Sequence, residues 1–107
     1  MHTVVRRYQQ AEELINLMTN RAEEVERVMS GTPGFVHYRA VRTGDGLTTI
    51  TVCQDKAGTD ESSRLAAAWV KENLSADAIS RLTPEISEGE SLIDFGSPQR
   101  LGAAVRA

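Results

Sequence analysis

The sequence predicts an α+β domain with the order strand, helix, strand, strand, helix, strand, and three stretches carry this prediction. Two strand-like runs, residues 35–41 and 47–53, flank the segment Thr-Gly-Asp-Gly at residues 43–46, which is typical of a hairpin turn. Two stretches with the period of an amphipathic helix lie before and after this hairpin. Such an order predicts a four-stranded antiparallel sheet with two helices on one face, the ferredoxin-like arrangement.

The composition is that of one globular domain of modest size. The chain has 107 residues, of which 40% are apolar, and large aromatic residues are scarce. We therefore expect a single modest core, which is compatible with a subunit that associates with a second copy. We predict one domain over residues 1–95 and a tail over residues 96–107, where glycine, proline and small residues follow no period.

Charge and cysteine content argue against several classes of function. The formal net charge is −3 and the basic residues are scattered, so no nucleic-acid partner is expected. The single cysteine, Cys53, cannot form an internal disulfide or a cysteine-based metal site by itself, and nothing else predicts a metal or a cofactor. No secretion signal is visible, and the apolar run at residues 65–70 is too short to cross a membrane. We expect a cytoplasmic, soluble protein without a membrane partner.

The first strand and the first helix are predicted from a change of period near residue 9. Residues 3–8 are rich in β-branched side chains and alternate, whereas an apolar helical stripe runs through residues 10–30. Arg6 and Arg7 point to opposite faces of the strand, and an unpaired arginine is costly to bury. We therefore expect a solvated position at the edge or rim of the sheet.

The second helix is predicted from its cap and its apolar stripe. Thr59 is the expected N-cap of a helix over residues 60–73, and Trp69 lies in the middle of its stripe as a core anchor. The remaining predicted features are a helical turn over residues 76–81, a fourth strand within residues 85–95 and a bulge or bend in that strand at Gly89.

The length of the hairpin loop decides which side chains face the helices, because neighbours along a strand alternate between the faces. With a three-residue loop at residues 44–46, the helix-facing side would hold Tyr38, Ala40, Ile50 and Val52. The alternative is a two-residue loop formed by Asp45 and Gly46. We prefer the three-residue loop, because it separates apolar from polar side chains more cleanly.

In the preferred register, five polar or reactive side chains share the open face of the sheet. They are His37, Arg39, Thr49, Thr51 and Cys53. His37 could accept a proton near neutral pH and Arg39 could hold a phenolate or a carboxylate, so these two are candidate catalytic residues. The threonines and Cys53 are candidate ligand-binding residues. The alternative interpretation is a polar dimer interface or ordinary strand side chains, with Cys53 as a small buried hydrophobe.

The order of elements, the Pro-Gly-Phe turn at residues 33–35 and the Gly-Asp-Gly hairpin resemble the dimeric α/β-barrel superfamily. Within it, the resemblance is to the antibiotic-biosynthesis-monooxygenase-like domains, and it covers about residues 3–95. It implies a homodimer in which the two open sheet faces pack together as a barrel. It also implies a cavity for a small aromatic or phenolic ligand and cofactor-independent monooxygenase chemistry.

Two departures from that family pattern bear on function. Monooxygenase-like members typically carry an aromatic residue at the end of the third strand, where this chain has Cys53-Gln54-Asp55. Haem-degrading members carry a histidine on the second helix, and this chain has none after His37, which disfavours haem degradation. Two functions remain open: an enzyme acting on small phenolic molecules, and a non-catalytic ligand-binding or interaction module of the same fold.

Overall fold

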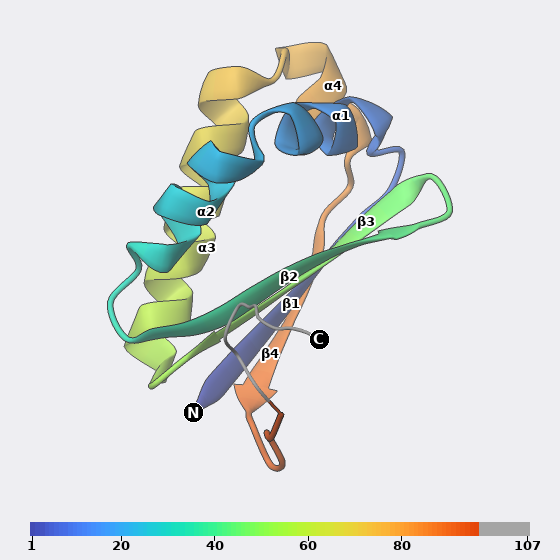
Figure 1. Cartoon of the computed structure of the whole chain (residues 1–107). Helices are drawn as coiled ribbons and strands as arrows, with labels where there is room; N and C mark the ends of the chain where they lie inside the picture. The colour runs from blue at the N-terminus through green and yellow to red at the C-terminus, as the bar shows by residue number, and fades with distance from the viewer. Residues whose placement is uncertain (97–107) are drawn as a thin grey trace.

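The computed structural model, described for residues 1–96, is a four-stranded antiparallel sheet with helices on one face (Figure 1). The strands lie in the order β2-β3-β1-β4, which confirms the predicted α+β, ferredoxin-like fold class. Apart from Gly96, the predicted tail lies outside the described residues. The elements are β1 His2–Tyr8, α1 Glu12–Asn20, α2 Ala22–Ser30, β2 Phe35–Thr43, β3 Gly46–Cys53, α3 Lys56–Asn73, α4 Ala76–Arg81 and β4 Glu85–Glu90.

The stretch predicted as one long helix is two helices that meet at Arg21. The backbone of Arg21 has φ −123° and ψ 39°, outside the helical region, and its side chain donates to Asn73 Oδ1 at 2.6 Å. The interruption lets α1 lie over one end of the sheet while α2 runs beside α3 (Figure 1). An apolar stripe alone does not reveal such a break, because both halves keep the same period.

The third helix begins earlier than predicted. Asp55 is its N-cap, and Asp55 Oδ1 accepts a hydrogen bond from Gly58 N at 3.1 Å. Thr59, the predicted cap, is instead buried within the helix, where its hydroxyl bonds His2 Nδ1 at 2.8 Å. The short helix α4 is capped by the Ser75 hydroxyl, which accepts from Ala78 N at 3.1 Å.

The predicted bulge in the fourth strand is wrong. Gly89 pairs with Thr3 in an uninterrupted antiparallel ladder between β1 and β4. The irregularity lies instead in β2, where the register shifts between Phe35 and His37.

The hairpin register differs from both predicted alternatives. Thr43 pairs with Gly46, so the loop consists of Gly44 and Asp45, and Gly44 has φ 66°. A glycine at the first loop position with positive φ is typical of a type II′ turn. Gly46 belongs to β3 because it lies against the neighbouring strand: a Cβ there would come within 2.7 Å of the Tyr8 carbonyl oxygen. Composition alone could not reveal this contact.

The register reverses the predicted faces of β3. Its helix-facing residues are Leu47, Thr49, Thr51 and Cys53, whereas Thr48, Ile50 and Val52 lie on the side without helices. We call that side the open face; it also holds His37, Arg39 and Val41 of β2 and Thr3, Val5 and Arg7 of β1. From His37 to Val41 the predicted faces of β2 are correct, since Tyr38 and Ala40 line a groove under the helices, whereas Phe35, before the register shift, pairs with Cys53 and lines the same groove.

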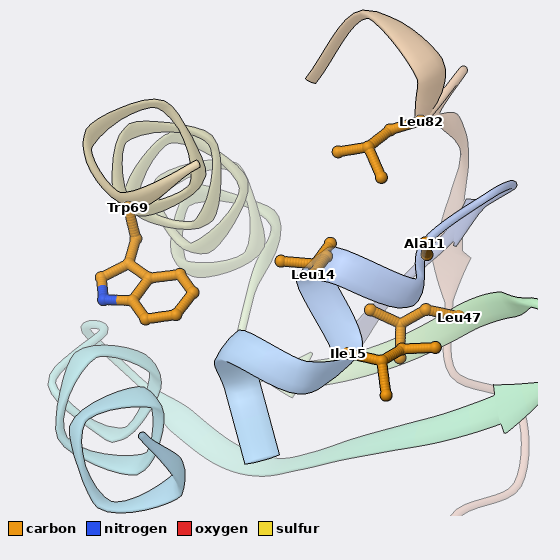
Figure 2. Packing of buried hydrophobic residues seen from close by; sticks show 6 residues of the cluster. All are labelled: Ala11, Leu14, Ile15, Leu47, Trp69 and Leu82. Atoms are coloured by element: carbon orange, nitrogen blue, oxygen red, sulfur yellow. The ribbon is translucent and has the colours of Figure 1, made fainter. Parts of the chain in front are cut away.

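The core lies between the helices and the helix-facing side of the sheet (Figure 2). Its cluster consists of Ala11, Leu14, Ile15, Leu47, Trp69 and Leu82. Trp69 is a core residue, as predicted, and its Nε1 donates to Glu24 Oε2 of α2 at 2.8 Å. In the described part of the chain, none of the helices is long and apolar enough to span a bilayer.

Candidate functional site

A groove of about 750 Å³ lies between β2 and the helices α1 and α2. Its lining is largely apolar and includes Met18, Val25, Met29, Phe35, Tyr38 and Ala40. Pockets of this size and apolar character hold small organic ligands in many proteins. Two methionines in the lining allow the wall to adapt to a ligand, because the methionine side chain is flexible and polarisable.

A smaller inner cavity of about 30 Å³ adjoins the groove. The two share Met18, Val25, Met29, Tyr38 and Leu47 in their walls. The polar part of the inner cavity comes from Arg6, Tyr8, Tyr38 and Thr49. The inner cavity is therefore mostly apolar as well, but a buried cation and three hydroxyl-bearing side chains contribute to its wall.

Arg6 is the most unusual group of the site. It lies in β1 with only 2% of its surface exposed, and its guanidinium donates to Thr51 Oγ1 at 3.1 Å and to Ser62 Oγ at 2.8 Å. A third hydroxyl, Ser63 Oγ, accepts at 3.0 Å. Within residues 1–96, no carboxylate pairs with this guanidinium. The positive charge is thus buried and solvated by neutral hydroxyls alone.

Burial controls the protonation of the groups around Arg6. It lowers the pKa of the guanidinium, which nevertheless stays charged because the ordinary pKa of arginine is so high. It raises the pKa of Tyr38 to about 12 and moves that of Tyr8 in the same direction, while the Arg6 charge opposes both shifts. Both tyrosines therefore carry their protons at neutral pH and can donate hydrogen bonds.

The five residues predicted as a site do not lie together. His37 and Arg39 are on the open face, whereas Thr49, Thr51 and Cys53 face the helices, because the hairpin register differs by one residue from the preferred one. The prediction that the five share one face is therefore wrong. Their individual roles stay predictions.

Each of the five has a distinct environment. His37 borders the groove, and its Nε2 lies 3.8 Å from Asp94 Oδ2. Arg39 is exposed and borders neither cavity. Thr49 lines the inner cavity and Thr51 accepts from Arg6, while Cys53 is fully buried and burial raises the pKa of its thiol.

The sequence-based interpretation missed Arg6 and Tyr8, and the first strand offers little signal for them. Val4 and Arg6 share one face while Val5 and Arg7 share the other, so each face has one valine and one arginine, and only Tyr8 distinguishes them. The general preference of arginine for the surface then decided the prediction. The structure shows that Arg6 is a core residue, so the expectation of a solvated rim position is wrong for it.

No family model and no curated protein matches this chain. Solved structures with a similar fold include a protein of unknown function from Nitrosomonas europaea, the cofactor-independent oxygenase SnoaB from Streptomyces nogalater and the heme-degrader MhuD from Mycobacterium tuberculosis. The TM-scores are 0.67, 0.61 and 0.60, at sequence identities of 17%, 16% and 17%. Each match covers 90% of this chain, and 93%, 97% and 100% of the respective other chain.

These similarities establish the fold. An antibiotic biosynthesis monooxygenase also matches, with a TM-score of 0.58, so the predicted resemblance to monooxygenase-like ferredoxin-fold proteins is confirmed at this level. A protein from an uncultured marine organism, described as a dimeric ferredoxin-like protein, matches with a TM-score of 0.58 at 11% identity. That match covers 88% of this chain and 96% of the other.

Proposed function

We propose that the chain binds a small aromatic molecule in the groove and oxygenates it without a cofactor, as a monooxygenase-like enzyme acting on phenols. The observation that carries this proposal is the largely apolar groove of about 750 Å³, together with an adjoining inner cavity whose wall includes the Arg6 guanidinium and hydroxyl-bearing side chains. The similarity in fold to the cofactor-independent oxygenase SnoaB supports it. Such a site would suit a flat apolar ring system with an oxygen substituent.

The chemistry requires that the substrate itself supply the electrons. A phenolate is more electron-rich than the phenol, so it reduces O₂ more readily, and Arg6 would stabilise its negative charge. For a phenol with a free para position, one atom of O₂ becomes the second carbonyl oxygen of a quinone. The other atom leaves as water together with the phenol proton and the para hydrogen.

His37 remains our proposed final acceptor of the phenol proton, which would reach it through water around the edge strand β2, because His37 lies on the open face and Arg6 on the helix-facing side. His37 borders the groove, and the carboxylate of Asp94, 3.8 Å from its Nε2, would stabilise the imidazolium that results. We assign Arg39 to the subunit interface instead, because it borders neither the groove nor the inner cavity.

Oxygen uptake tests the proposal. We expect the purified protein to accelerate O₂ consumption by a dihydroxynaphthalene with a free para position, without added metal or cofactor. Labelled O₂ should place one labelled atom in the product, as seen by mass spectrometry. Ala40→Trp is the matched variant, because Ala40 lines the groove and a large side chain there should fill it. Equal uptake by this variant and the wild type would contradict the proposal.

A non-catalytic ligand-binding module is the second candidate. It is favoured by the composition of the inner cavity, whose lining residues include no carboxylate, imidazole or other general base. Saturable binding of the naphthalene compound without oxygen uptake would identify this function. Haem is not a proposed ligand, because α1 to α4 contain no histidine that could bind its iron.

We also propose that the protein is a homodimer formed through the open face. The middle of that face is aliphatic, with Val5 and Ile50 side by side and Val41 on the adjoining strand. Arg7 and Arg39 contribute positive charge and Glu85 of the neighbouring β4 contributes negative charge, so two copies can match opposite charges. The dimeric ferredoxin-like protein of the same fold supports this assembly.

A further inference from the structure

Two buried polar atoms from different strands are without partners at the inner cavity. They are Arg6 Nε of β1 and Thr49 Oγ1 of β3, and the two residues are paired directly across these strands. The Thr49 side chain lies beside the Tyr38 hydroxyl and lowers its pKa as a hydrogen-bond partner does, although the contact lacks the distance and angle of a regular hydrogen bond. Buried polar groups are normally satisfied, so two unpartnered atoms in residues that line one cavity point to a place where a small side-chain movement would admit a ligand group or water.

The charge of the cavity lining selects the kind of group. Arg6 contributes a cation, and the hydroxyls of Tyr8, Tyr38 and Thr49 can all donate. The lining holds no carboxylate that would neutralise the guanidinium. Removing a charge from water without a counter-charge is costly, so an anion in this cavity would be bound favourably.

The size of the cavity limits what can enter. About 30 Å³ exceeds the volume of about 10–15 Å³ that a cavity needs to hold one water molecule, so an oxygen-bearing group fits there but an aromatic ring does not. The adjoining groove of about 750 Å³ has room for the ring. Tyr38, Met18 and Met29 stand in the wall that the two spaces share.

We infer that Arg6, Tyr8, Tyr38 and Thr49 form an anion pocket that receives the negatively charged oxygen of an aromatic ligand whose ring occupies the groove. The ligand class is an aromatic carboxylate or a phenolate. This inference rests on the proposed function for the location of the ring, and adds the charge that the ligand must carry. Arg6 is then a binding residue, and its burial without a carboxylate partner is what reserves it for the ligand.

A pair of matched probes tests the inference: naphthoate, which is anionic, and naphthamide, which has nearly the same shape and no charge. Binding is measured by quenching of Trp69 fluorescence and by calorimetry, in chloride-free buffer at neutral pH. The wild type should prefer naphthoate by about tenfold to a hundredfold, the range for a hydrogen bond to a charged group. Naphthol, as the phenolate arm, should release a proton on binding, which calorimetry in two buffers of different ionisation enthalpy detects.

Arg6→Met should abolish the preference by weakening naphthoate binding alone, with naphthamide binding unchanged. Arg7→Met is the matched control, because Arg7 carries the same charge on the same strand but faces the open side. It should keep the full preference. If circular dichroism shows that Arg6→Met does not fold, Thr49→Val replaces it as the test. The preference of Thr49→Val for naphthoate over naphthamide should be several-fold lower than that of the wild type, because a hydrogen-bond donor is lost.

Equal binding of the two probes by the wild type would overturn the anion pocket and leave the proposed groove intact. A preference that survives in folded Arg6→Met, or that disappears in Arg7→Met, would also overturn it. Failure of both probes to bind would count against the proposed function itself.

Discussion

A guanidinium in a protein core usually lies beside a carboxylate, because an unpaired buried charge is expensive. Arg6 lies instead among the hydroxyls of Thr51, Ser62 and Ser63. These hydroxyls hold the side chain in one position without neutralising it. The fold thus tolerates a destabilising charge at the inner end of the groove, a cost that proteins accept at functional sites more often than elsewhere.

Tyr38 should make the stability of the protein fall at high pH. Its pKa is raised by burial from 10.0 to about 12, so between these values the unfolded chain loses a proton that the folded chain keeps. The folded state then binds more protons, and the free energy of unfolding decreases as the pH rises. The full effect is on the order of 2–3 kcal/mol, and the contribution is intact below about pH 10.

Urea unfolding of the wild type and of Tyr38→Phe from pH 9 to 12 checks this expectation. The variant should lose less stability over the range about 10 to 12. At neutral pH the two should differ little, because the substitution removes only the hydroxyl and keeps the ring that lines both cavities. Parallel pH profiles of the two proteins would contradict the assigned shift.

Single residues were the hardest scale to predict from the sequence. The role of Trp69 followed from its place in an apolar stripe, and it is indeed in the core. The prediction that five residues share one face was wrong because it depended on the length of the hairpin loop, and a shift of one position exchanges the two faces of a strand. The prediction that Arg6 is solvated was wrong because it applied the average preference of arginine for the surface, whereas the side chains of Thr51 and Ser62 that Arg6 contacts are themselves buried.

At the scale of elements, the contact between α3 and β3 depends on a glycine. A Cβ on Gly58 would lie 2.5 Å from the Pro33 carbonyl oxygen and 2.8 Å from Cys53 Cβ, both too close. The absence of a side chain at Gly58 therefore allows the first turn of the helix to pack on the end of the strand. Since Asp55 caps this turn, the cap and the glycine together fix where α3 begins.

Gly58→Ala should destabilise the protein by about 1–3 kcal/mol, the usual cost of overpacking. This sign is opposite to the general effect of replacing glycine by alanine within a helix, which is stabilising. Gly89→Ala is the matched control, because a Cβ at Gly89 meets no atom within 4 Å. Its free energy of unfolding, measured by denaturant titration, should change by less than about 0.5 kcal/mol. A stabilised Gly58→Ala would show that α3 can shift away from β3.

The strong periodic signals predicted the elements, whereas their ends depended on contacts between distant segments. The hairpin strands and the apolar helices were expected at about the right positions. The break at Arg21 and the early start of α3 were not, since both are decided by how helices fit over a twisted sheet. Thr59 has the residue type of a cap, but its hydroxyl bonds His2, far away in the sequence.

At the scale of the whole molecule, the sheet has one face under helices and one without them (Figure 1). The element order predicted this asymmetry, because a split β-α-β pattern places both crossovers on the same side. The segment after β4 returns to part of the open face, where Ser91 Oγ bonds Thr3 Oγ1 and Asp94 approaches His37. The middle of the face, around Ile50 and Val5, is where we place the partner subunit.

Ile50→Glu should convert the protein to a monomer. Ile50 lies centrally on the open face, between Val5 on β1 and Arg39 on β2, and it is only partly exposed in the single chain. A carboxylate there would be buried in the dimer without a positively charged partner of its own. The free energy of burying this charge would exceed what an interface of ordinary size contributes to association. Light scattering at micromolar concentration should give twice the chain mass for the wild type and the chain mass for the variant.

Ala67→Glu, on the exposed side of α3, introduces the same charge away from the sheet and should remain a dimer. Retained ellipticity in Ile50→Glu would show that the fold survives, so that the loss of mass reports association alone. A wild type that is already a monomer would exclude the dimer, while the helix–sheet groove, which lies within one chain, would be unaffected.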